Sequence, residues 1–73
     1  MSLLPESDCA VLASAYELQT AEVAEDASRL QQWAGPEADL VIVLEERHGW
    51  TVISEYGPYY VAALRQALLH AGR

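Results

Sequence analysis

Two Gly-Pro pairs constrain this chain more strongly than any other feature of its sequence. Gly35-Pro36 and Gly57-Pro58 stand in the interior of a chain of only 73 residues. Glycine favours turns, and proline cannot continue a helix or a central strand, so each pair marks the boundary between two elements. The pairs therefore divide the chain into three segments, and its length allows these segments to form a single domain over residues 1–73.

The first segment, from Glu6 to Ala34, has the composition and the periodicity of a helix. It is rich in alanine, leucine, glutamate and glutamine, which favour helices. Its apolar residues recur mostly every three or four positions, as one helix face requires. Pro5 suits the start of this helix. Thr20 is also a suitable N-cap, so a break near Gln19–Ala21 into two helices is the alternative.

The second segment is expected to form a β-hairpin. Leu40–Leu44 is an unbroken apolar run in which the three central residues are β-branched, and such a run is typical of a strand that is buried on both faces. Trp50–Glu55 has the composition of a return strand. His48-Gly49 between them fits a two-residue turn with glycine in the left-handed region.

The third segment, from Pro58 to about Ala71, is expected to be a helix with proline in its first turn and Gly72 after its end. The fold class that follows is α+β, a small single domain of helix, β-hairpin and helix. Its element order is α-β-β-α, or α-α-β-β-α if the first helix breaks near residue 20.

A homodimer is expected because a single chain of this size has few ways to stabilise itself. Cys9 is the only cysteine, so no disulfide can form within the chain. An isolated two-stranded hairpin is marginal in water. An unbroken first helix would be about 42 Å long, which exceeds a domain diameter of roughly 30 Å. Two copies with their hairpins edge to edge would form an extended antiparallel sheet with two-fold symmetry.

The charge of the chain indicates which partners it can bind. Four arginines and no lysine stand against 11 acidic residues, which gives a formal net charge of −7. This charge argues against direct binding of nucleic acid or anionic membranes, and it favours a protein partner with a basic or mixed surface. Residues 1–15 lack a basic signal region, and no apolar run approaches the ~18 residues of a membrane span, so a cytoplasmic location is expected.

The sequence contains none of the common motifs of an independent enzyme. The Walker phosphate loop, G-x-G-x-x-G, G-x-S-x-G, H-E-x-x-H and C-x-x-C are all missing. One cysteine and two histidines are too few for a typical zinc site. We therefore expect no catalytic residue, no cofactor and no metal, and a protein that is not an enzyme.

Two groups of residues are the candidates for partner binding. Aromatic residues and arginine dominate the energetics of protein interfaces, and a corner between the second and third segments concentrates them. An acidic ridge on the first helix is the other candidate, because it could occupy a basic groove or imitate a row of DNA phosphates. The candidates are Arg47, Trp50, Tyr56 and Tyr59 at the corner and Glu17, Glu22, Glu25 and Asp26 on the ridge.

The function expected from these features is a non-enzymatic protein–protein interaction module. A small acidic regulator, an adaptor and a phage-type inhibitor all fit, and DNA mimicry is a narrower version. The lysine-free composition, rich in alanine and leucine, is compatible with a bacterial or phage origin. The alternative is an accessory subunit of a bacterial enzyme complex that has no catalytic residues of its own.

Overall fold

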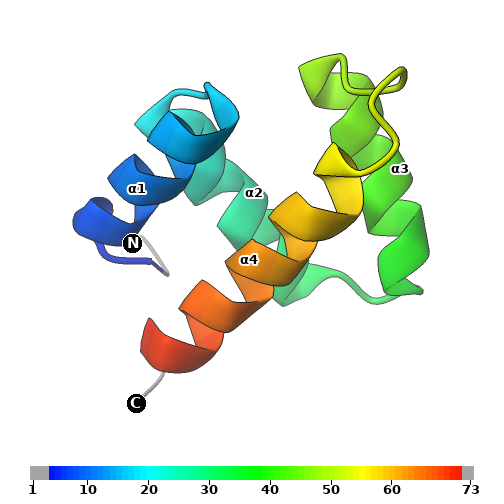
Figure 1. Ribbon diagram of the computed structural model, residues 1–73. Coiled ribbons are helices and arrows are strands. Elements are labelled where there is room, and N and C mark those ends of the chain that lie inside the picture. Colours follow the sequence, from blue (N-terminus) through cyan, green and yellow to red (C-terminus); the bar gives the residue numbers. More distant parts are fainter. Residues whose placement is uncertain (1–3, 72–73) are drawn as a thin grey trace.

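The computed structural model describes residues 4–71, and over this range it contains four helices and no strand (Figure 1). In chain order these are α1 (Glu6–Tyr16), α2 (Thr20–Gln32), α3 (Glu37–His48) and α4 (Tyr56–Ala71). The domain is therefore all-helical, and the α+β class expected from the sequence is wrong.

The expected hairpin is wrong because its first strand lies inside α3. Leu40 and Leu44, one helical turn apart, are both fully buried, whereas Ile42 between them is exposed. In a strand these three residues would share one face. Burial at every fourth position lets α3 pack against α4, and this packing overrides the strand preference of the β-branched residues between the two leucines.

The two ends of α3 carry helix signals that the apolar run obscures. Glu37 and Asp39 lie in its first turn, and Arg47 and His48 lie in its last turn. This order of charges is the one that the helix dipole favours. Gly49 follows with a φ of 75°, so the glycine that was expected in a hairpin turn is the C-cap of a helix.

The expected return strand, Trp50–Glu55, is the connection between α3 and α4. The Ile53 amide donates to the Trp50 carbonyl at 2.8 Å, and the Tyr56 amide donates to the Ile53 carbonyl at 3.2 Å. These are successive tight turns that lead into α4. The extended sheet through which two copies were expected to pair therefore has no strands within residues 4–71, and the homodimer itself stays a prediction.

The first segment is two helices, which is the alternative that Thr20 suggested. Glu17 ends α1 in the left-handed region, with a φ of 57°. Gln19 precedes α2, and its amide donates to the carboxylate of Glu22 at 3.0 Å, as in a capping box. This break divides a helix that would be too long for the domain into two shorter helices that pack side by side.

The C-terminal helix expected from Pro58 is present and begins slightly earlier, at Tyr56. Pro58 therefore lies in the first turn, where a missing N–H group costs little. Gly57 is buried where α4 approaches α3, because a Cβ at this position would come within 2.5 Å of Cγ of Glu45. A side chain at this position would therefore force the Glu45 side chain to move.

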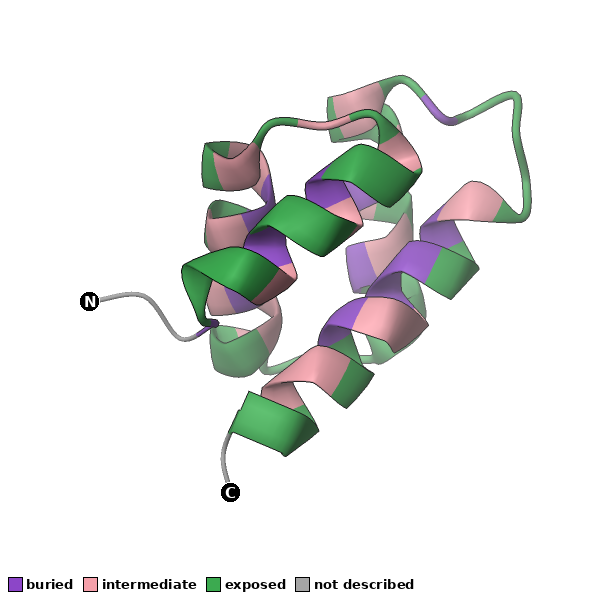
Figure 2. Ribbon diagram, turned by 60° about the vertical axis from the view of Figure 1, so that its left-hand side comes forward, coloured by how far each residue is buried: buried purple, intermediate pink, exposed green. Residues whose placement is uncertain are grey.

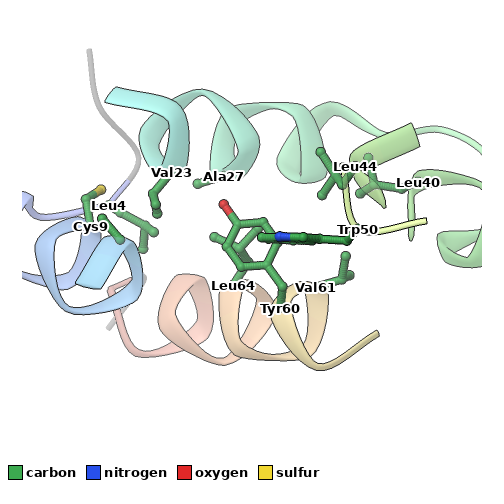
Figure 3. Close-up of a cluster of buried hydrophobic side chains, with 11 residues drawn as sticks. Leu4, Cys9, Val23, Ala27, Leu40, Leu44, Trp50, Tyr60, Val61 and Leu64 are labelled. Atoms are coloured by element: carbon green, nitrogen blue, oxygen red, sulfur yellow. The ribbon is translucent and has the colours of Figure 1, made fainter. Parts of the chain in front are cut away.

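The core lies where α4 packs against the other three helices. The α4 helix contacts α1, α2 and α3, and α1 also packs on α2, with the buried faces turned inward (Figure 2). Tyr60 and Leu64 project from α4 between the side chains of α2 and those of α3 (Figure 3). The buried apolar residues are Leu4, Cys9, Ala13, Val23, Ala27, Leu40, Leu44, Trp50, Tyr60, Val61 and Leu64.

Candidate functional site

A buried polar cluster joins α2, α3 and α4. Asp26 of α2 is 0% exposed, and its Oδ2 accepts a hydrogen bond of 2.6 Å from the Tyr60 hydroxyl. The same oxygen lies 2.7 Å from Nε2 of His48, whose side chain is 1% exposed. The other ring nitrogen, Nδ1, is 3.7 Å from Oε2 of Glu22. A carboxylate is costly to bury unless it is paired and hydrogen-bonded, and these contacts meet that requirement.

An ion-pair cluster covers the other oxygen of Asp26. Arg47 places Nη2 2.9 Å from Oε2 of Glu25 and Nε 3.8 Å from Oδ1 of Asp26. Arg29 Nη2 lies 3.7 Å from the second oxygen of Glu25. Oδ1 of Asp26 has no hydrogen-bond partner, so the Arg47 guanidinium balances its charge without a hydrogen bond.

These contacts involve part of the acidic ridge that was expected on the first helix. Asp26 is inside the domain, and Glu25 lies between two guanidinium groups. Glu22 is half-buried beside His48, and Glu17 is exposed at the end of α1. The DNA-mimic hypothesis therefore loses two of the four free charges on which it depended.

An aromatic platform, consisting of Tyr16, Trp50, Tyr56 and Tyr60, packs beneath the α3–α4 connection. The ring centroid of Tyr60 lies 5.1 Å from that of Tyr16 and 5.2 Å from that of Trp50. The ring centroids of Trp50 and Tyr56 are 5.6 Å apart. All three pairs have the edge-to-face geometry that aromatic quadrupoles favour. The His48 ring packs against the Trp50 ring with centroids 4.8 Å apart and planes tilted by 39°, so the platform is continuous with the buried polar cluster.

Burial suppresses the ionisation of three groups in the interior. Burial, and after it the hydrogen bond to Asp26, raises the pKa of Tyr60 far above the ordinary tyrosine value. Burial likewise raises the pKa of Tyr16. Burial also raises the pKa of the Cys9 thiol, and because the thiolate is the reactive form, this cysteine is a packing residue.

The α3–α4 corner, defined as residues 51–59, presents exposed apolar side chains. Val52 is 88% exposed, Tyr59 is 63% exposed and Ile53 is 41% exposed. Trp50 directly precedes this segment and Tyr56 lies within it, and the two rings pack against each other and against Tyr16. The corner therefore consists of a buried aromatic base and an exposed aliphatic and tyrosine surface.

Carboxylates lie within the corner and next to it in sequence, and together they form its acidic border. Glu55 precedes α4 and is exposed, and Glu46 is exposed on the last turn of α3. Glu45 lies against Gly57 at the start of α4. Arg47, the cation nearest in sequence, is paired with Glu25 instead. The border of this apolar surface is therefore negative.

The structure separates the residues that were expected to form one aromatic docking patch. Tyr59 is freely exposed, whereas Trp50 is 7% exposed and Tyr56 is half-buried. Arg47 pairs with Glu25 of α2. The aromatic candidates thus divide into a buried platform and one exposed tyrosine.

The sequence did not predict that His48 and Tyr60 would meet Asp26 in a buried cluster, nor that Val52 and Ile53 would be exposed. One signal was present for the buried cluster: Asp26 falls on the apolar stripe of α2, directly before the buried Ala27. A carboxylate on a core-facing stripe requires partners. No comparable signal marks Val52 and Ile53, because their exposure depends on the turn geometry.

Comparison with protein-family models, with curated protein sequences and with solved structures found no match. Among residues 4–71, no helix is both long and apolar enough to cross a lipid bilayer. The same residues contain no group of three or more His, Cys, Asp or Glu side chains arranged to hold a metal ion.

Proposed function

We propose that the protein is a non-enzymatic module that binds a basic surface on another protein. The observation that carries this proposal is that the described arginines form ion pairs within the domain. Within residues 4–71, Arg29 and Arg47 pair with Glu25, and Arg65 pairs with Glu37. The described cations are thus occupied by contacts within the domain.

The acidic residues are not neutralised in the same way. Seven carboxylates form no ion pair with another residue in the described range, and they are distributed over the helix ends and connections. They are Glu6, Asp8, Glu17, Asp39, Glu45, Glu46 and Glu55. Exposed charge of one sign attracts partners of the opposite sign and accelerates their association.

The burial of the polar cluster supports the non-enzymatic part of the proposal. Catalysis requires that a general acid or base reach within hydrogen-bond distance of substrate. Asp26 and Tyr60 are 0% exposed, and the His48 side chain is 1% exposed. His48 and Tyr60 contact Oδ2 of Asp26 and thereby join three helices.

Affinity capture at two salt concentrations tests the proposal. Tagged protein is incubated with lysate of its own source cells at low salt and at 0.5 M salt, and the partner that is recovered is purified and titrated calorimetrically. We expect a partner with a basic surface whose affinity falls with salt, because screening weakens exposed charge contacts.

A variant that removes three negative charges and keeps the side-chain shapes tests the same point. A variant with Glu6→Gln, Glu46→Gln and Glu55→Gln should bind the purified partner more weakly than the natural chain. The proposal is wrong if no partner is recovered, or if binding is insensitive both to salt and to these substitutions.

A further inference from the structure

We propose that the α3–α4 corner is the docking face and that it accepts a partner segment with an aliphatic or aromatic centre flanked by arginine or lysine. This inference rests on the proposed function and names its site. Three exposed apolar side chains, Val52, Ile53 and Tyr59, occur within residues 51–59. Single exposed apolar residues are ordinary on protein surfaces, but several that lie close together in the chain and include an aromatic residue point to an interaction site.

The other large exposed apolar residues do not form such a group. Val11 lies on α1, Ile42 on α3 and Leu69 near the end of α4. Each of them stands alone on the exposed side of a different helix. The corner is therefore the place in the described chain where exposed apolar residues are adjacent in sequence and continue onto the first turn of a helix.

The corner is held in shape before any partner arrives. Trp50 is packed against His48, Tyr16 and Tyr60 at the beginning of the connection, and Tyr56 packs on Trp50 at its end. Hydrogen bonds across two successive turns fix the backbone between them. A surface that is already ordered loses little conformational entropy on binding, which favours affinity.

The charges around the corner indicate the chemistry of its occupant. Glu55 lies within the corner, Glu45 lies against Gly57, and Glu46 is exposed on the last turn of α3, whereas Arg47 is paired with Glu25. An apolar centre with a charged border is the usual anatomy of a protein interface. A partner segment that complements this border carries arginine or lysine on each side of an apolar centre.

The same border argues against a second copy of this chain as the occupant. A two-fold contact through the corner would place each acidic border against its equivalent in the other copy. Like charges brought together at an interface are unfavourable. A basic partner meets no such repulsion.

Three synthetic peptides of 12 residues serve as probes of this preference. The first has a leucine–tryptophan centre flanked by arginines, the second has the same centre flanked by glutamates, and the third has a serine centre flanked by arginines. Each is titrated into isotopically labelled protein, and the backbone amide shifts are followed by NMR. We expect saturable binding of the first peptide, with the largest shifts in residues 49–60.

The second and third peptides separate charge from apolar contact. The glutamate-flanked peptide should not saturate, and the serine-centred peptide should bind about tenfold more weakly, as expected when an interface loses its apolar anchor. The inference is overturned if the serine-centred peptide binds equally well, or if the shifts centre on α1 or α2.

Substitutions at the corner provide the second measurement. Val52→Ser and Tyr59→Ser should each weaken binding of the first peptide by about tenfold. Val11→Ser is the matched apolar control, because Val11 is 67% exposed and lies outside the corner. This control should bind like the natural chain, and equal losses at corner and control positions would contradict the inference.

The two proposals fail in different ways. If a basic partner is captured and both corner variants bind it as tightly as the natural chain does, the corner is the wrong site and the proposed function stands. If no peptide binds, the same variants are measured against the captured partner, where a selective loss supports the corner. If neither peptide nor partner binds, both proposals are overturned.

Discussion

At the residue scale, the most constrained position is Asp26. Its Oδ2 is contacted by the Tyr60 hydroxyl and by Nε2 of His48, and these three side chains come from three different helices. Removing one partner of a buried polar cluster leaves the others unsatisfied, which costs more than the lost hydrogen bond alone. The cluster therefore fixes how α2, α3 and α4 meet.

Tyr60→Phe tests the strength of this cluster. The substitution removes one hydrogen bond to a buried carboxylate and keeps the ring, so we expect the free energy of unfolding to fall by about 1–3 kcal/mol in urea denaturation. Tyr59→Phe is the matched control, since Tyr59 is the adjacent residue and is exposed. If the two substitutions lower the free energy of unfolding equally, the buried hydrogen bond does not stabilise the domain.

The raised pKa of Tyr60 predicts a loss of stability at alkaline pH. In the unfolded chain the hydroxyl ionises near pH 10, whereas burial keeps it protonated in the folded domain. The contribution of this tyrosine is therefore fully present below about pH 10 and is lost above it, by about 1.4 kcal/mol per pH unit. The chain has no lysine, so no lysine titration overlaps this range.

The measurement is the free energy of unfolding between pH 9 and pH 11. Tyr16, whose pKa is also raised by burial, contributes to the same decline. Tyr60→Phe should reduce the slope above pH 10 by the equivalent of one proton. A variant that follows the slope of the natural chain would rule out Tyr60 as a source of this dependence.

At the element scale, two helices end in the left-handed region with different residues. Gly49 ends α3 with a φ of 75°, and Glu17 ends α1 with a φ of 57°. Glycine adopts this conformation freely, whereas a residue with a Cβ is strained by about 1 kcal/mol. Adding a Cβ at position 49 and removing one at position 17 should therefore change the free energy of unfolding in opposite directions.

Gly49→Ala should destabilise the domain, and Glu17→Gly should stabilise it, each by about 1 kcal/mol. A Cβ at Gly49 would meet no atom within 4 Å, so its cost is one of backbone conformation alone. Thermal unfolding of the two variants measures both changes. Stabilisation by the first, or destabilisation by the second, would contradict this account of the helix ends.

The close approach of α3 and α4 predicts a coupling between Gly57 and Glu45. A Cβ at Gly57 would come within 2.5 Å of Cγ of Glu45, so Gly57→Ala alone should be destabilising. Glu45→Ala removes the obstructing atoms. The double variant should recover most of the lost stability, because residues in contact have coupling energies of about 0.5–3 kcal/mol. Urea denaturation of the single and double variants measures this coupling. If the two effects are simply additive, the Glu45 side chain is not what obstructs a side chain at position 57.

At the scale of the whole molecule, the surface area is that of an ordinary small protein. The area is 4698 Å² for a chain of 8.0 kDa, against about 4450 Å² expected for a monomer of this mass. The chain therefore exposes about as much surface in total as a folded monomer of its size does.

The homodimer predicted from the sequence is tested by sedimentation equilibrium at micromolar concentration. A mass of two chains supports it, and the mass of one chain of 8.0 kDa contradicts it. Repeating the measurement with Val52→Ser separates self-association through the corner from self-association elsewhere. We expect this substitution to leave the mass unchanged, because the acidic border opposes contact between two corners.

Local sequence determined the limits of several helices and the sign of the surface charge. The break at Thr20 and the helix that ends at Ala71 follow from capping residues and from apolar periodicity, which act over one or two turns of chain. The excess of carboxylates follows directly from composition. These features require no knowledge of how distant segments pack.

Only the tertiary structure decided the state of Leu40–Leu44 and the assembly of the site. The β-branched run favours a strand locally, but burial of two leucines against α4 makes it a helix. Asp26, His48 and Tyr60 meet because three helices pack together, and no spacing along the chain encodes that meeting. Contacts between distant residues depend on the whole arrangement, which local propensity does not specify.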